Sequence, residues 1–150
     1  MSCSVFVPTG WMGRRHPDVD GERILGAGEI RELADAGVEI GAHTVDHVSL
    51  PDLPFDQVLD QLKRSRATLE DLLGRPVRTM AYPHGALSPE TERAAAQAGY
   101  EVACGCAGPG PWRAFSLPRE PVFASAGKLR LRLKMAGLYG PVHRLRARAA

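Results

Sequence analysis

The chain has 150 residues, of which 44% are hydrophobic and 24% charged, and this composition excludes wholesale disorder, a collagen-like chain and a coiled coil. A chain of this length buries about 68–70% of its unfolded surface, so it can form one domain with a sizeable core. No apolar run approaches the roughly 18–20 residues of a membrane span, and no signal peptide is evident, so we expect a cytoplasmic protein. Three cysteines are an odd number, which favours a reducing compartment over a disulfide scaffold.

The net charge of +2 is unevenly distributed along the chain. Residues 128–150 contain seven basic and no acidic residues, which leaves 12 basic and 17 acidic residues, a net charge of −5, in residues 1–127. We therefore expect a globular domain over 1–127, followed by a basic helix and tail over 128–150. A solvated helix face is the simpler interpretation of the tail. The alternative is an adaptor whose tail docks on an anionic membrane or on nucleic acid. Of these two partners, we do not expect nucleic acid.

Apolar runs and helical periodicity alternate along the chain. Short, buried-type apolar runs predict strands at residues 3–7, 38–42, 77–82 and 100–104. Amphipathic periodicity with N-cap, proline and glycine signals predicts helices at 28–36, 55–73 and from 89 to the glycine at 99. Residues 11–27 and 105–111 are predicted loops, and weaker signals favour short strands at 115–117 and 121–123 and a basic helix at 127–138. The alternation predicts a parallel sheet with crossover helices.

In such folds the chemistry lies at the carboxyl ends of the strands, where the loops after Val7, Ala42 and Tyr82 would gather. The loop after Ala42 contains His43-Thr44-Val45-Asp46-His47. Two histidines four positions apart can point the same way and share one metal ion. The alternative is a pair of surface histidines, with Asp46 an ordinary loop acid.

The loop after the third predicted strand contains Tyr82-Pro83-His84-Gly85. Backbone N–H groups at such a turn can stabilise a developing oxyanion. The alternative is a structural turn with Tyr82 packed on the core. Of the three cysteines, we expect Cys3 to lie in the core. The spacing of Cys104-Gly105-Cys106 is too short for a zinc knuckle, so we expect one core thiol and one incidental thiol there. His16 and His143 are expected on the surface.

Taken in order, three segments resemble the motifs of the polysaccharide deacetylase family (carbohydrate esterase family 4, the NodB-homology domain). Residues 4–11 resemble the family's second strand and the Thr-Gly turn after it. Residues 41–47 resemble its His-Ser/Thr-x-x-His metal motif, and residues 81–85 its Ala-Tyr-Pro-Tyr-Gly motif. The resemblance implies an α/β fold, an incomplete distorted (β/α) barrel whose first βα unit is missing. Similarity to the tails of short members of the family continues at residues 117–119, 130–134 and 137–141.

The resemblance also implies a hydrolase of carbon–nitrogen, non-peptide bonds that removes N- or O-acetyl groups from a polysaccharide or amino sugar. Its cofactor would be a divalent metal, with zinc expected, bound by His43 and His47, and the Thr44 hydroxyl would brace the turn between them. Two imidazoles and a carboxylate leave coordination positions open for water and the acetyl oxygen. The metal would activate that water near neutral pH and polarise the carbonyl group.

The third motif would supply the remaining site residues. The backbone N–H of His84 would help to hold the oxyanion, and Tyr82, Pro83 and His84 would bind the substrate's acetyl group. Arg119 would replace the family's base-orienting arginine, because Ala81 stands at that position. The implied catalytic residues are therefore His84, Tyr82 and Arg119.

One departure from the family pattern bears directly on activity. The first motif, Thr-Phe-Asp-Asp, supplies the catalytic base and the third metal ligand, and nothing here matches it; Asp18 and Asp20 are the nearest candidates by position. The family's late histidine also has no clear match. The alternative function is therefore a catalytically inactive remnant that binds a glycan or a protein partner. Loss of the first strand would also leave a sheet edge at residues 3–7, which predicts self-association.

Overall fold

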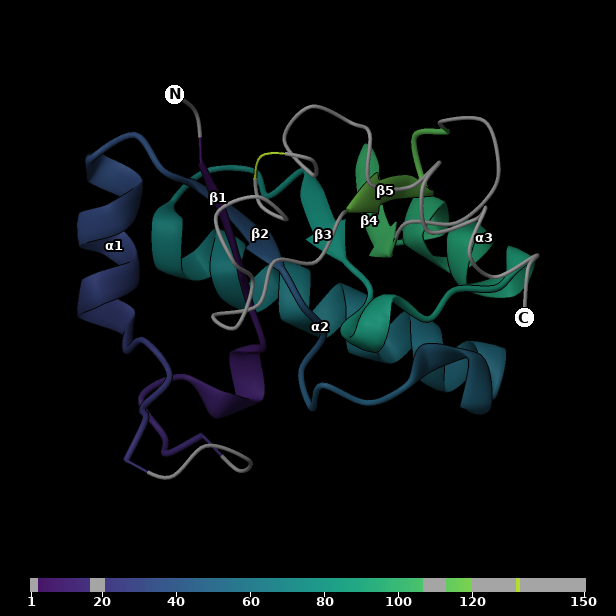
Figure 1. The fold of residues 1–150 in the computed structure, drawn as a ribbon, viewed down its shortest axis with the longest axis horizontal. Helices are drawn as coiled ribbons and strands as arrows, with labels where there is room; N and C mark the ends of the chain where they lie inside the picture. The colour runs from purple at the N-terminus through teal and green to yellow at the C-terminus, as the bar shows by residue number, and fades with distance from the viewer. Residues whose placement is uncertain (1–2, 17–20, 107–112, 120–131, 133–150) are drawn as a thin grey trace.

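The computed structural model describes residues 3–16, 21–106, 113–119 and 132, and within them the fold is one parallel sheet with helices (Figure 1). The strands are hydrogen-bonded in the order of the sequence, and each pair of neighbours is parallel. In the described residues the strands are β1 (Ser4–Val7), β2 (Glu39–Ala42), β3 (Thr79–Ala81), β4 (Val102–Cys106) and β5 (Leu117–Arg119). The predicted parallel sheet is confirmed.

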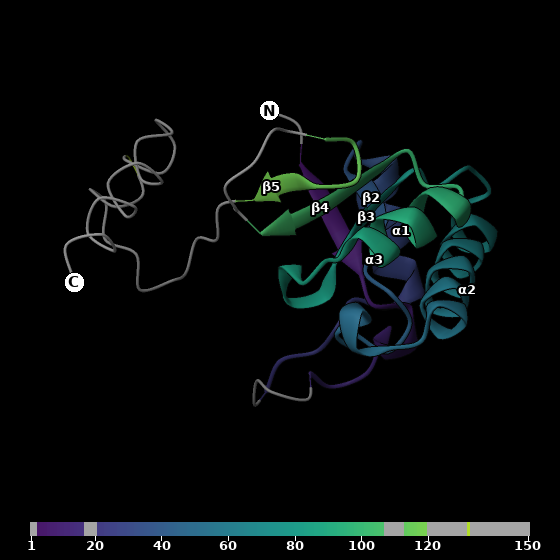
Figure 2. The same ribbon diagram turned by 90° about the vertical axis from the view of Figure 1, so that its right-hand side faces the viewer.

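The helices α1 (Ala27–Asp35), α2 (Phe55–Leu73) and α3 (Pro89–Gln97) pack beside the sheet, as Figure 2 shows for α2 and α3. Short 3₁₀ turns lie at η1 (Thr9–Trp11), η2 (Leu50–Asp52) and η3 (Pro83–Gly85). One core joins the buried side chains of the strands with those of the helices: Val7, Ile40, Met80 and Ala103 with Ile30, Val58, Leu62, Leu69, Ala94 and Ala95. No helix in the described ranges is long and apolar enough to cross a membrane.

Local sequence signals explain where the helices begin and end. In α2, Val58, Leu62 and Leu69 fall on one buried face, and the helix stops at Gly74, whose φ of 65° is left-handed. α3 begins at a capping box in which the Ser88 side chain accepts a hydrogen bond from the Thr91 backbone N–H and the Thr91 hydroxyl accepts one from the Ser88 N–H. These helices were predicted from the same signals, and α2 has the predicted bounds.

The sheet curves strongly across its inner face, the face away from the helices. The guanidinium carbon of Arg119, on β5, lies 5.6 Å from the ring centroid of Phe6, on β1. Side chains from the first and fifth strands of this sheet can meet only if the sheet bends towards closure. The predicted incomplete α/β barrel is therefore confirmed.

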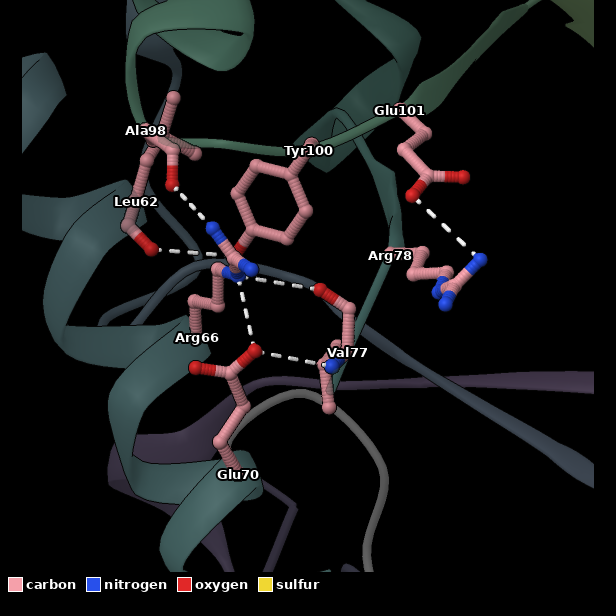
Figure 3. A network of polar contacts seen from close by, with 8 residues as sticks. All are labelled: Leu62, Arg66, Glu70, Val77, Arg78, Ala98, Tyr100 and Glu101. Atoms are coloured by element: carbon pink, nitrogen blue, oxygen red, sulfur yellow. Dashed lines mark hydrogen bonds and ion pairs between the residues drawn. The ribbon is translucent and has the colours of Figure 1, made fainter. Parts of the chain in front are cut away.

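A network of polar contacts ties the amino ends of β3 and β4 to α2 (Figure 3). Arg66 donates hydrogen bonds to Glu70 (3.0 Å), to the Val77 carbonyl (3.1 Å) and to the Ala98 carbonyl (2.8 Å), and its guanidinium lies over the Tyr100 ring. The Tyr100 hydroxyl in turn donates to the Leu62 carbonyl at 3.0 Å. Because this network satisfies buried carbonyl groups at the end of the sheet opposite the histidines, its role is structural.

Two predictions about the cysteines and β4 were wrong in part. Cys3 is exposed rather than in the core, because it precedes β1, a strand at the edge of the described sheet. The loop predicted from residue 105 begins later, since Gly105 and Cys106 extend β4 by pairing with Pro118 and Arg119. Cys106 is exposed and agrees with the predicted incidental thiol. Cys104 is only half-buried, so it is not the core thiol that was predicted.

Several predictions fall outside the described residues. They concern Asp18 and Asp20, the strand at 121–123, the basic helix and tail, and His143. The domain boundary at 127 and the tail's partners therefore stay predictions. β1 does lie at a sheet edge, but self-association also stays a prediction.

Candidate metal and catalytic site

The loops after β1, β2 and β3 meet at the carboxyl ends of the strands, as predicted. The backbone N–H of Thr9 donates to the Thr44 carbonyl at 3.0 Å, and that of Gly10 to the Val45 carbonyl at 2.9 Å. A Cβ at Gly10 would lie 2.8 Å from that Val45 oxygen, so only glycine allows this approach. The first loop therefore holds the histidine motif from one side.

The imidazole rings of the motif lie next to each other and next to the third loop. The ring centroids of His43 and His47 are 4.8 Å apart, and those of His47 and His84 are also 4.8 Å apart. The Trp11 ring lies 5.0 Å from His47 and 6.0 Å from His16, centroid to centroid. The structure thus brings together the two predicted metal ligands and the predicted oxyanion turn.

His43 is oriented by the end of β3. Its Nδ1 lies 2.6 Å from the Ala81 carbonyl oxygen, which can only accept, so Nδ1 carries the proton and Nε2 has a free lone pair. Burial lowers the pKa of His43 to about 4; the Ala81 hydrogen bond opposes this shift, and the nearby His47, Arg119 and His84 add to it. The ring is therefore neutral near pH 7, which is the form that binds a metal ion.

The turn between the two histidines is built around a buried threonine. Thr44 is fully buried with a φ of 67°, and its hydroxyl accepts a hydrogen bond from the His47 backbone N–H at 3.0 Å. The Ser65 hydroxyl, on α2, donates to the Thr44 carbonyl at 3.0 Å. A left-handed β-branched residue is strained, so these bonds hold the turn in a costly conformation. The predicted bracing role of the Thr44 hydroxyl is confirmed.

Gln61, on α2, was not found by sequence reasoning. Its side-chain oxygen accepts from the backbone N–H groups of Val45 (3.0 Å) and Asp46 (3.1 Å), and its nitrogen donates to the Asp46 carboxylate at 2.6 Å. The Asp46 carboxylate is thus bound to the α2 side of the loop, which fits the interpretation of an ordinary loop acid. No local pattern marks Gln61, because its partners lie 15 or 16 residues away in the chain.

The third loop combines a buried tyrosine with an exposed histidine. Tyr82 and Pro83 are buried, and the Tyr82 hydroxyl donates to the Phe115 carbonyl at 3.0 Å. Burial raises the pKa of Tyr82, so its hydroxyl stays protonated. His84 is exposed, with a φ of 56°. The Tyr82 side chain therefore packs on the core, as the alternative interpretation held, and only its backbone faces the turn.

The Arg119 side chain contacts the residue at the start of this turn. Its Nε donates to the Gly105 carbonyl at 3.1 Å, and a terminal nitrogen donates to the Tyr82 carbonyl at 3.4 Å. These contacts connect the carboxyl ends of β3 and β4. Arg119 therefore supports the turn and adds a positive charge near His43.

The site supplies two of the three protein ligands that a catalytic zinc site uses. Neutral imidazoles suit zinc, and His43 and His47 are neighbours with one ring already oriented by a hydrogen bond to a carbonyl group. Within the described residues, no group of three His, Cys, Asp or Glu side chains could hold a metal ion.

The Thr9 hydroxyl is buried without a hydrogen-bond partner, although the backbone N–H of the same residue donates to the Thr44 carbonyl.

Comparison with known proteins identifies the family. The family model described as polysaccharide deacetylase matches residues 1–103, and the chain belongs to that family. YxkH of Bacillus subtilis (strain 168), which carries the name of a polysaccharide deacetylase, is 26% identical over 102 residues, 68% of this chain and 34% of its own length. The chain thus spans about a third of that relative.

Solved structures that share the fold include a deacetylase and a pseudoenzyme. The deacetylase PplD of Streptococcus pyogenes, solved in complex with acetate, superposes with a TM-score of 0.74 at 21% identity, covering 89% of this chain and 58% of PplD. A mutant of BA3943, a pseudoenzyme of carbohydrate esterase family 4 from Bacillus anthracis, superposes with a TM-score of 0.50 at 24% identity, covering 52% of this chain and 29% of its own. Both likenesses concern the fold alone.

Proposed function

We propose that this chain is the part of a metal-dependent deacetylase that binds the metal and the acetyl group, acting on a polysaccharide or amino sugar. The observation that carries the proposal is the approach of His43 and His47, 4.8 Å between ring centroids, beside the Tyr82–Gly85 turn. Membership of the polysaccharide deacetylase family supports the substrate class.

His43 and His47 would hold a divalent metal, with zinc favoured by imidazole donors. When bound, the metal supplies a nucleophilic water near neutral pH and polarises the acetyl carbonyl group. His43 would bind through Nε2, since Nδ1 is hydrogen-bonded to Ala81. The Thr44 and Gln61 hydrogen bonds keep the loop that carries His47 in one conformation before any ligand arrives.

The third loop would receive the acetyl group. His84 is exposed and has a left-handed backbone conformation, and its N–H would donate to the developing oxyanion. Pro83 and the backbone of Tyr82 would form the floor of the acetyl pocket. Arg119 would act as a positioning residue, because it reaches the site through the Tyr82 carbonyl.

A second candidate is a catalytically inactive domain that binds a glycan without turnover. It is favoured by the lack, among the described residues, of a carboxylate that completes a three-ligand group with the histidines. Without such a group, neither the general base nor the third ligand is accounted for. The two candidates differ in whether acetate is released.

The test measures zinc content and acetate release from chitooligosaccharides for the wild type, His43→Ala, His47→Ala and the control His16→Ala. We expect bound zinc to fall in the two motif variants and to persist in the control. Zinc content unchanged in both motif variants would show that the ligands are wrongly assigned. Chelator-sensitive acetate release would refute the inactive-domain candidate, whereas glycan binding without release would support it.

A further inference from the structure

The His47 imidazole is packed among three other aromatic rings. Its ring centroid lies 4.8 Å from that of His43, 4.8 Å from that of His84 and 5.0 Å from that of Trp11. His43 is the other proposed metal ligand, and His84 belongs to the proposed acetyl turn. Trp11, the last residue of η1, has neither role, and its indole nitrogen can only donate a hydrogen bond, so it cannot bind a metal ion. Its contact with His47 therefore needs a separate explanation.

The backbone of Trp11 is fixed relative to the histidine loop. The Trp11 N–H donates to the Pro8 carbonyl at 3.0 Å, and the Trp11 carbonyl accepts from the Arg14 N–H at 3.0 Å. The neighbouring Gly10 donates its N–H to the Val45 carbonyl at 2.9 Å, an approach that any Cβ at Gly10 would block. The first loop therefore presents the indole to the histidine loop at a defined place.

The indole is suited to hold a neighbouring ring. It is half-buried, its plane is tilted by 46° from that of His47, and it also makes an edge contact with His16 at 6.0 Å. A tryptophan side chain has only two torsions, so ordering it costs little conformational entropy. Aromatic pairs at such separations attract each other beyond the area that they bury. An imidazole packed in this way has fewer orientations open to it, which lowers the entropic cost of binding a ligand in one of them.

We propose that Trp11 is the positioning residue of His47, and that its indole keeps this imidazole beside that of His43. The hydrogen bond to the Ala81 carbonyl has the corresponding role for His43. The inference rests on the proposed function where it concerns the metal, since it takes the two histidines to be the ligands. Trp11 would act only through His47, so its loss should weaken metal binding without abolishing it.

The test makes two measurements on the wild type, Trp11→Ala and Trp11→Phe. The first is the nuclear Overhauser effect between the ring protons of His43 and His47 in the metal-free chain, which should weaken in Trp11→Ala and persist in Trp11→Phe. The second is zinc affinity by titration calorimetry, which should fall by about twofold to tenfold in Trp11→Ala, the effect of one lost aromatic pair, and be restored in Trp11→Phe. Trp11→Leu keeps apolar volume without a ring, and it carries the same expectations if Trp11→Ala does not fold.

The matched control is Phe55→Ala. Phe55 is also a half-buried aromatic residue, which packs on the core at the start of α2, and the Arg93 guanidinium lies over its ring at 4.9 Å. This variant should melt at a lower temperature, because it loses apolar packing, and should keep both the effect between the histidine rings and the zinc affinity. It thereby separates a general loss of stability from a loss of positioning.

An unchanged effect between the histidine rings in Trp11→Ala refutes the inference, and so does an equal weakening in Phe55→Ala. The proposed function has a separate readout, because His43→Ala and His47→Ala should lose zinc whether or not Trp11 positions a ring. A weakened ring effect in Trp11→Ala, in a chain whose wild type binds no zinc, would retain the positioning of His47 and overturn the metal-dependent function. Zinc bound equally well by the wild type and Trp11→Ala would retain that function and overturn the role of Trp11.

Discussion

Replacing Thr44 by valine tests whether one hydroxyl holds the histidine loop in place. Valine keeps the β-branch and nearly the same volume, so the strain at a φ of 67° is retained. What is lost is the acceptor for the His47 backbone N–H, now bonded at 3.0 Å. Leaving a partly buried donor without a partner costs about 1–3 kcal/mol, and the half-exposed position of His47 places the expected loss at about 1–2 kcal/mol.

Three measurements check this prediction. Urea unfolding should show the loss of stability, hydrogen exchange at the His47 amide should become faster, and zinc affinity should fall by about 5- to 30-fold if the loop must be reordered at that cost. The control Thr44→Ser keeps the hydroxyl and loses a buried methyl group, so it should lose about 0.8 kcal/mol of stability while zinc affinity and His47 exchange stay unchanged. Equal exchange rates at His47 in the valine and serine variants would refute the reasoning.

Three further predictions concern Gly85 and Thr9, in loops at the carboxyl ends of the strands, and Tyr100, in the core. Gly85→Ala should lower the melting temperature, because a Cβ there would overlap Sγ of Cys106. The left-handed φ of 69° would cost alanine about 1–2 kcal/mol more. An unchanged melting temperature would contradict the close approach of Gly85 and Cys106. Thr9→Val should leave stability equal or raise it by about 1 kcal/mol, because the buried hydroxyl has no partner; a clear loss of stability would show that it has one. Burial raises the pKa of Tyr100, so the unfolded chain releases this proton first and stability should fall as pH rises through about 10. Urea midpoints between pH 8 and 11 should fall less steeply for Tyr100→Phe, and identical slopes would rule out this cause.

Features that depend on nearest neighbours in the chain could be predicted from the sequence. The bounds of α2 follow from its periodicity and from Gly74, and the start of α3 follows from Ser88 and Pro89. The alternation of strands and helices predicted a parallel sheet, and parallel strands bring their following loops to one edge. For this reason the closeness of His43, His47 and the third loop could be anticipated from motifs that are separated in the sequence.

The contacts that fix the site were decided by tertiary structure alone. Gln61 and Ser65 reach the histidine loop from α2, and Arg119 reaches the third loop from β5, across 37 residues of chain. Exposure also depended on the final sheet order: Cys3 is exposed because β1 lies at an edge, although its sequence neighbours are typical of a buried strand. Such pairings depend on the register of the strands, the curvature of the sheet and the rotation of each helix against it. None of these is a local property of the chain, so composition, spacing and periodicity could locate the candidate ligands but could not show which side chains hold them in place.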